Sequence, residues 1–420
     1  MSHPTFSELL ATFFKIGCLS FGGAAGQIAM MHRMIVDDKG WIEEKDYLAG
    51  LNFCTLLPGP EAQQLATYIG WRLHGIAGGV AAGLLFVLPG AVLILVLAQL
   101  YVLGTGIPAV DGLLLGIKAA VIAIIAEAVL KFAKRGLKSR ALIGVAIAAF
   151  VAMMLFALPF PVVVIGAALA GILIGRASPL PAQTQPETRV AFPARAAALC
   201  LALWWLPVCL AALMLGGGHL LVEIGLFFSK LALVTFGGAY ALLAYLSDEA
   251  VARGWVSAAQ MLDALGFAET TPGPTILVNP FVAFIAGGKK GGLMAWFAGL
   301  MALWTTFAPS FLWIFVGGPY LGKITANRTL SAALAGISAA VVGIISTVGT
   351  KFALVFLFSG IAPMNIGPLH LPRPAAWPDP LATALVLLAL ALTFLRHWPM
   401  LRMLMMLAAI GLCFGLLGLR

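Results

Sequence analysis

Long apolar runs, broken only by short polar segments, extend along the whole chain. Runs of this length can cross a hydrocarbon core about 30 Å thick as α-helices. The longest polar, proline-rich interruption is residues 176–195, and the densest basic stretch is Lys131–Arg140. The pattern therefore predicts an all-α polytopic membrane protein without a sizeable domain outside the bilayer.

The pattern occurs twice. The segment K-I-G-C-L-S-F-G-G-A, Lys15–Ala24, returns as K-L-A-L-V-T-F-G-G-A, Lys230–Ala239. The motif L-P-G-P that ends at Pro60 returns as T-P-G-P 214 positions later, and G-I-K-A-A-V from Gly116 returns as G-I-S-A-A-V from Gly336. Landmarks kept in one order over such a distance indicate two homologous repeats.

The repeats define the predicted organisation. We expect a first repeat over residues 1–175, a cytoplasmic linker over 176–195, a connecting transmembrane helix over 196–216 and a second repeat over 217–420. Basic loops favour the cytoplasm, which places Lys131–Arg140 and the linker there. With six spans per repeat and one connecting helix between the repeats, equivalent helices are seven spans apart, an odd number. The second repeat is then inverted relative to the first, as in many secondary transporters.

Composition narrows the class further. The 420 residues are 62% hydrophobic and 10% charged with a mean hydropathy of +1.04, which excludes a soluble fold. The net charge of +9 fits basic cytoplasmic loops rather than nucleic-acid binding. Cysteines and histidines are scattered, so neither a metal site nor a disulfide framework is expected. We also expect no cofactor, no enzymatic activity and no secretory signal before the mature chain.

Each repeat carries two elements that interrupt a helix inside the membrane. One is a Gly-Gly pair and the other a Pro-Gly-Pro triplet, which ends one helix and starts another because proline lacks an N–H donor. Inside a bilayer such a break survives only where it is buried or lines a cavity, and its free N–H groups and helix dipole favour an anion. The alternatives are tight helix packing for Gly-Gly and a plain kink for Pro-Gly-Pro. The candidate substrate-binding residues at these breaks are Ser20, Phe21, Gly22, Gly23, Pro58, Gly59, Pro60 and Gln64 in the first repeat, and Thr235, Phe236, Gly237, Gly238, Thr271, Pro272, Gly273 and Pro274 in the second.

Charged residues within apolar segments complete the candidate site. Lys15 and Lys230 stand at equivalent positions before the Gly-Gly pairs, and two cations suit a dianion; the alternative is that each reaches an interface along its alkyl stem. Glu269 is the better proton-coupling candidate, and Glu61 is a second one that alternatively caps a half-helix. Arg72, Lys118 and Glu127 are secondary candidates.

These motifs resemble the two-domain chromate ion transporter family. The match rests on F-x-K-x-G-x-x-S-F-G-G, G-W and L-P-G-P-x-x-Q in one half, and on F-S-K-x-x-x-x-T-F-G-G and A-E-T-T-P-G-P in the other. Glu61 departs from the small or apolar residue expected there. The resemblance implies a bacterial or archaeal inner-membrane protein that exports chromate and confers chromate resistance. By residue chemistry alone, a sulfate-like oxyanion, a passive anion channel and a homodimeric assembly stay open.

Overall fold

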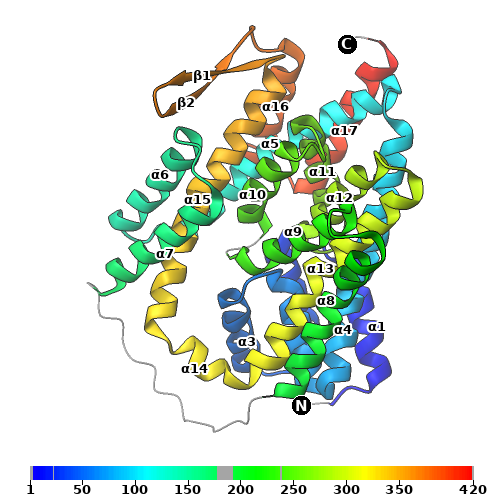
Figure 1. The fold of residues 1–420 in the computed structure, drawn as a ribbon, viewed down its shortest axis with the longest axis vertical. Coiled ribbons are helices and arrows are strands. Elements are labelled where there is room, and N and C mark those ends of the chain that lie inside the picture. Colours follow the sequence, from blue (N-terminus) through cyan, green and yellow to red (C-terminus); the bar gives the residue numbers. More distant parts are fainter. Residues whose placement is uncertain (1–2, 22, 177–192, 237–238, 419–420) are drawn as a thin grey trace. The chain divides into compact units, whose positions relative to one another are not determined.

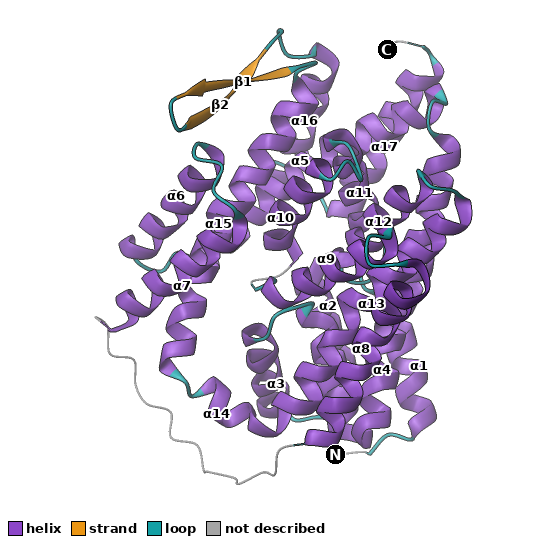
Figure 2. Cartoon of the chain, viewed as in Figure 1, coloured by secondary structure: helices purple, strands orange, loops and turns teal. Residues whose placement is uncertain are grey.

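A computed structural model describes residues 3–21, 23–176, 193–236 and 239–418, and helices make up most of it (Figure 2). The first-repeat helices are α1 Phe6–Leu19, α2 Gly23–His32, the π-helical turn η1 Arg33–Asp37, α3 Glu44–Leu56, α4 Glu61–Gly104, α5 Pro108–Gly136, α6 Arg140–Met154 and α7 Phe160–Arg176. The helix α8, Ala194–Leu215, corresponds to the predicted connecting helix, whereas most of the predicted linker lies outside the described residues (Figure 1).

The second repeat follows the same order. Its helices are α9 Leu220–Val234, α10 Ala239–Ala252, α11 Ala258–Thr270, the 3₁₀ turn η2 Thr275–Leu277, α12 Val278–Gly288, α13 Gly292–Gly317, the 3₁₀ turn η3 Gly318–Tyr320, α14 Leu321–Thr325, α15 Arg328–Leu357, α16 Pro380–Phe394 and α17 Met400–Leu416. Between α15 and α16 lies an antiparallel hairpin of β1, Ile361–Ile366, and β2, Leu369–Pro374. The prediction of helices alone therefore missed this hairpin.

Helix lengths distinguish complete spans from half-spans. Five of the described helices are long and apolar enough to cross a membrane: α4, α5, α8, the continuous segment of α13 and η3, and α15. Helices α1 and α3 have 14 and 13 residues, so each is only about 20 Å long. Among the described residues, the helices of full spanning length are thus fewer than the six spans per repeat that the sequence predicted.

The described residues form two compact units, and neither coincides with one repeat. One unit draws on residues 1–99, 180–242 and 271–331, and the other on 100–179, 243–270 and 332–420. We call them the break unit, which contains both Pro-Gly-Pro triplets, and the glycine-packed unit. Each unit combines segments of both repeats, so the repeats are folded into one another rather than side by side.

In the break unit, α4 is a hairpin of two helices. The backbone leaves helical geometry at His74 and Gly75, where Gly75 has φ +60°. The chain reverses there, since a Cβ atom on Gly70 would lie 2.3 Å from the carbonyl oxygen of Gly78. The first half of α4 (residues 61–73) therefore packs against the second half (residues 76–104) at backbone contact distance.

Helix α3 and the first half of α4 form a helical hairpin. The Tyr68 ring packs against Gly50, and one turn further out Arg72 bonds to Asp46 at 3.3 Å. These pairs lie equally far before and after Gly59, so the Pro-Gly-Pro triplet is the tip of the hairpin. Each arm is about 20 Å long.

The second half of α4 also packs antiparallel to α13, its equivalent in the other repeat. The Gly79 backbone meets the ring of Phe315, and 16 residues further along α4 the side chain of Leu95 meets Gly299, 16 residues earlier on α13. Equivalent helices of the two repeats thus run antiparallel and in contact with each other.

The glycine-packed unit repeats this exchange between repeats. Helix α5 packs antiparallel to α17 through Gly112 and Gly411, and α15 packs antiparallel to α7 through Gly336 and Gly171. Small residues permit such approach, which supplies van der Waals contact where lipid offers no hydrophobic drive. In each case the long helix of one repeat holds the last helix of the other.

Candidate functional site

The first Pro-Gly-Pro break ends α3 at Leu56 and starts α4 at Glu61. Gly59 has φ +117°, a conformation that side chains rarely adopt. Its amide donates a hydrogen bond of 2.9 Å to the carbonyl oxygen of Thr235, directly after α9 of the other repeat. The tip of the first hairpin is thus joined to the end of helix α9, which precedes the second Gly-Gly pair.

The second break is joined in the reverse sense. Gly273 has φ +104°, and its amide donates a hydrogen bond of 2.8 Å to the carbonyl oxygen of Ser20 after α1. Ser20 and Thr235 are equivalent positions, as are Gly59 and Gly273. We call this reciprocal pair of hydrogen bonds the crossed breaks. Reciprocal contacts of this kind are the signature of two-fold symmetry.

The crossed breaks alter one expectation. The sequence predicted that the N–H groups of both triplets are free to hold an anion, yet the amides of Gly59 and Gly273 are both used between repeats. The physical reason is that a half-helix also leaves carbonyl oxygens unpaired at its C-terminal end. Each break therefore donates a hydrogen bond to a carbonyl oxygen of the opposite repeat that its own helix leaves unpaired.

A second pair of equivalent positions supports the triplets from behind. A Cβ atom on Gly59 would lie 3.5 Å from Oγ of Ser310, and a Cβ atom on Gly90 would lie 2.0 Å from the carbonyl oxygen of Pro272. Gly90 and Ser310 follow Pro89 and Pro309 in the second half of α4 and in α13, 220 positions apart. Each break thus rests on the proline-containing helix of the other repeat.

Buried polar side chains surround the crossed breaks. Gln27 of α2 donates from Nε2 to the carbonyl oxygen of Gly273, and Gln64 donates from Nε2 to that of Pro58 at 2.7 Å. Asn279 donates from Nδ2 to Oγ1 of Thr306 at 3.1 Å. Gln27, Gln63 and Gln64 are fully buried, with no solvent exposure.

Part of this polar capacity has no protein partner. Among the described residues, both amide atoms of Gln63, Oγ of Ser310, and the side-chain oxygens of Gln27, Gln64 and Asn279 are buried without a hydrogen bond. A buried polar atom without a partner costs about 1–3 kcal/mol, so unpaired groups concentrated in one region suggest a ligand site. We call Gln27, Gln63, Gln64, Asn279 and Ser310 the polar shell.

Part of the polar shell can donate to a small oxyanion. Nε2 of Gln63 and the hydroxyl of Ser310 are unpaired groups that can donate, whereas Gln27 and Gln64 are oriented by their bonds to backbone carbonyls and leave only an oxygen unpaired. Neutral donors can hold a tetrahedral anion while the surroundings supply compensating charge.

The predicted break residues lie at or beside this region. Ser20, Thr235, Thr271, Gly273 and the other members of the two triplets are buried or half-buried in the break unit. The Ser20 hydroxyl donates to the carbonyl oxygen of Ile16 and that of Thr235 to Leu231, so both hydroxyls stabilise their own helix ends. Phe21 is exposed and Phe236 is half-buried.

The Gly-Gly pairs are only partly described. Gly23 has φ +71° and begins α2, and its Cβ position would lie 3.9 Å from Oγ1 of Thr275. Gly22, Gly237 and Gly238 lie outside the described residues. Helix α1 thus ends at Leu19, and α2 begins at Gly23 beside the second Pro-Gly-Pro segment.

The predicted lysines differ from the polar shell in their solvent exposure. Lys15 of α1 and Lys230 of α9 are both exposed on the surface of their helices. Their matching environment agrees with the repeat symmetry, and their exposure means that they do not belong to the buried set. They remain predicted charge-compensating residues.

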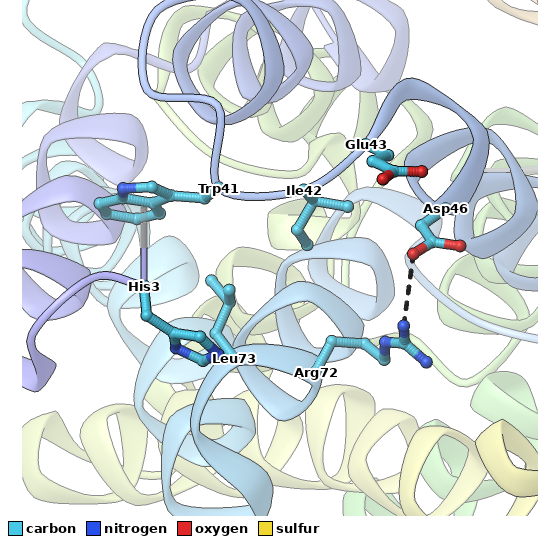
Figure 3. A pocket seen from close by; sticks show the side chains of 7 residues that line it. All are labelled: His3, Trp41, Ile42, Glu43, Asp46, Arg72 and Leu73. Carbon is cyan, nitrogen blue, oxygen red and sulfur yellow. Dashed lines mark hydrogen bonds and ion pairs between the residues drawn. The ribbon is translucent and has the colours of Figure 1, made fainter. Parts of the chain in front are cut away.

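Four of the other charged candidates occupy different settings. Glu61 is half-buried at the start of α4, whereas Glu269 is 3% exposed near the end of α11, in the glycine-packed unit. Glu127 pairs with Lys131 at 2.7 Å on α5. Figure 3 shows Arg72 directed at Asp46, in a surface pocket bordered by His3 and Trp41. Arg72 therefore joins the two arms of the hairpin at its open end, far from its tip.

Sequence reasoning missed several residues of this region. Gly90 and Ser310 carry a readable signal, because a proline followed by a small residue recurs in equivalent apolar helices. Asn279 is one of the polar residues that flank the second break in the sequence, and Gln27 is a polar residue in an apolar segment, which is a weaker signal. The motif L-P-G-P-x-x-Q ends on Gln63, although its neighbour Gln64 is the residue predicted to bind substrate.

Comparison with known proteins gives one consistent result. The chromate transporter family model matches residues 7–172 and 222–416. A chromate transport protein of Pseudomonas aeruginosa is 34% identical over 93% of this chain and 92% of its own length. A chromate transport protein of Cupriavidus metallidurans is 30% identical over 82% of each chain.

A more distant relative and the solved structures add context. An uncharacterized transporter of Methanocaldococcus jannaschii is 25% identical over 84% of this chain and 86% of its own length. No solved structure matches the chain significantly. With its apolar helices, the chain is a multi-pass membrane protein, and it belongs to the chromate transporter family, a family of membrane transporters and not of enzymes.

Proposed function

We propose that the chain is a secondary transporter that exports chromate across the inner membrane by alternating access, driven by the membrane potential or by protons. The observation that carries the proposal is the crossed breaks, in which the two Pro-Gly-Pro triplets exchange hydrogen bonds and are surrounded by the polar shell. Substrate sites at helix breaks between two repeats, near the bilayer midplane, are typical of secondary transporters.

The two-fold relation supports an inverted arrangement of the repeats. A two-fold axis along the membrane normal would leave equivalent helices parallel, whereas an axis in the membrane plane makes them antiparallel. The antiparallel contact of α13 with the second half of α4 favours the second case. In this arrangement symmetry makes the two faces of the membrane equivalent, so equivalent movements open a central site to one side or to the other.

Burial of the polar shell favours a transporter over a channel. Gln63 and Gln64 have no solvent exposure, and Asn279 and Ser310 are each 1% exposed. A channel needs a continuous aqueous path, whereas a transporter passes through states in which its site is sealed. Opening this region requires the triplets or their supporting helices to move.

The proposal that chromate is the substrate rests on the names of the relatives and on the chemistry of the site, and sulfate shares that chemistry. Both ions are tetrahedral dianions, so the donors of the polar shell fit either. Lys15 and Lys230 supply positive charge at equivalent positions, which a dianion requires. We propose chromate as the physiological substrate and sulfate as a competitor.

The test is uptake of labelled chromate into everted membrane vesicles, with sulfate as competitor and a protonophore as control. Saturable uptake that an opposing gradient drives uphill is the expected result. Linear, non-saturating flux that only dissipates gradients would indicate a channel and refute the proposal. Gln63→Leu should weaken apparent chromate affinity, while Arg72→Gln, at the open end of the hairpin, should leave it unchanged.

Topology has its own test. Single cysteines near Lys39 and Arg253, introduced on a cysteine-free background, report which face of the membrane each loop occupies. Labelling from opposite faces is expected for inverted repeats. Labelling from the same face would overturn the inverted arrangement. It would not change the conclusion drawn from the transport assay.

A further inference from the structure

One buried ion pair lies outside the polar shell. In the glycine-packed unit, Asp263 of α11 is 2% exposed, and its Oδ1 lies 3.2 Å from Nζ of Lys118 on α5. Tyr101, in the last turn of α4, donates a hydrogen bond of 3.1 Å to Oδ2. The carboxylate is therefore held by a cation and a phenol that come from two other helices.

The packing around this pair is tight. The Tyr101 ring stands edge-on to Phe267 with ring centroids 5.9 Å apart, and Gly266 brings α11 against Ile117 of α5. Among the described residues, the charged or titratable groups that act on Asp263 from the packed elements are Lys118 and Asp111 of α5 and Tyr101 of α4. A separation of α5 from α11 would thus remove the one cation in this set.

The acid and the cation are not repeated in the other half of the chain. The positions equivalent to Asp263 and Lys118 are Ala49 and Ser338, which are neutral and belong to different compact units. The buried acid and its cation thus stand at positions where the other repeat carries no charge. A buried ion pair is seldom the best way to stabilise a fold, because desolvation offsets its attraction. An intramembrane carboxylate that appears in only one of two equivalent places is therefore a candidate for function.

We propose that Asp263 carries a proton during transport, and that Lys118 and Tyr101 control whether it does so; this rests on the proposed transport function. Burial disfavours the ionised carboxylate, whereas the ammonium and the phenol stabilise it. When α5 and α11 are in contact, the carboxylate stays ionised. When they part, Asp263 takes up a proton and becomes a neutral acid, and the release of that proton restores the ion pair.

The first experiment uses the full-length protein in proteoliposomes. Chromate flux is measured against an imposed pH gradient, alongside equilibrium chromate exchange without a gradient. Asp263→Asn should retain exchange and lose the response to the pH gradient. The matched control is Asp248→Asn, because Asp248 also pairs with a lysine, Lys351, at 2.8 Å, but both side chains are solvent-exposed. Asp248→Asn should keep the response, and its loss there would overturn the proposal.

A double variant separates a proton carrier from a structural pair. Lys118→Ser with Asp263→Ala introduces the residues that the other repeat has at these positions. If the pair is only structural, this variant keeps a full response to the pH gradient, and the proposal is wrong. If Asp263 carries the proton, the variant folds and exchanges chromate without that response.

A spectroscopic test is independent of chromate. An infrared pH titration of the purified protein should show the carbonyl band of a buried protonated carboxylic acid, and Asp263→Asn should remove that band. A band that persists in the variant would overturn the proposal. If the wild-type protein carries no chromate, the proposed function fails, but this titration still decides whether Asp263 binds a proton.

Discussion

Replacing Gly90 by alanine is the sharpest test of the crossed breaks. The added Cβ would lie 2.0 Å from the carbonyl oxygen of Pro272 and 2.7 Å from Cδ1 of Leu277. Backbone cannot rotate away as a side chain does, so either α4 or the second triplet must move by about 1 Å. The movement disturbs the hydrogen bond from Gly273 to Ser20, and that from Gln27 to Gly273.

The magnitude follows from these contacts. Overpacking in a close-packed interior costs about 1–3 kcal/mol, and each weakened hydrogen bond adds about 0.5–1.5 kcal/mol. We therefore expect Gly90→Ala to destabilise the break unit by roughly 2–6 kcal/mol, since the overpacking and the two weakened hydrogen bonds add. If the strain falls on the transport-competent state, even about 2 kcal/mol reduces chromate flux by roughly thirtyfold.

The assay is initial chromate uptake in everted vesicles, normalised to protein in the membrane, together with the thermal midpoint of the purified protein. The control is Gly166→Ala on α7, where an added Cβ meets nothing within 4 Å. This control should keep its flux and its thermal midpoint. Wild-type flux and midpoint in Gly90→Ala would refute the close approach of α4 to the second triplet.

The remaining predictions concern charge. Lys15→Gln and Lys230→Gln should each reduce chromate flux severely, and arginine at either position should retain part of it, because charge is kept while the compact ammonium is lost; normal flux in both glutamine variants would exclude the lysines as compensating charges. Glu44, with which His32 shares a hydrogen bond, and Asp37 raise the pKa of His32 above its usual value near 6.5. Because the folded-state pKa is raised, the stabilisation is complete below the unfolded pKa and is lost as pH rises through the folded value. As the pH rises through the folded-state pKa of His32, the thermal midpoint of the wild-type protein should therefore fall, and it should fall less in His32→Gln. An equal pH dependence of the midpoint in both proteins would disprove the role of His32.

Some features were readable from the sequence because their causes are local or compositional. A chain with few charges and long apolar runs has no soluble alternative, and the two repeats are visible as ordered motifs. The positions of the breaks also follow from single residues: proline removes a donor, and glycine alone accepts the backbone of Gly59 and Gly273. This chemistry is the same wherever the segment lies in the fold.

Other features depended on the tertiary structure because membrane helices lack a polar face that marks their orientation. Lipid is as apolar as the protein interior, so the pattern does not tell which side of α1 or α9 is buried, and Lys15 and Lys230 lie on the exposed side. The partners of the triplet amides, and the pairing of Asp263 with Lys118, join residues more than a hundred positions apart. Such pairings are set by how the two repeats fold into one another, which no local pattern encodes.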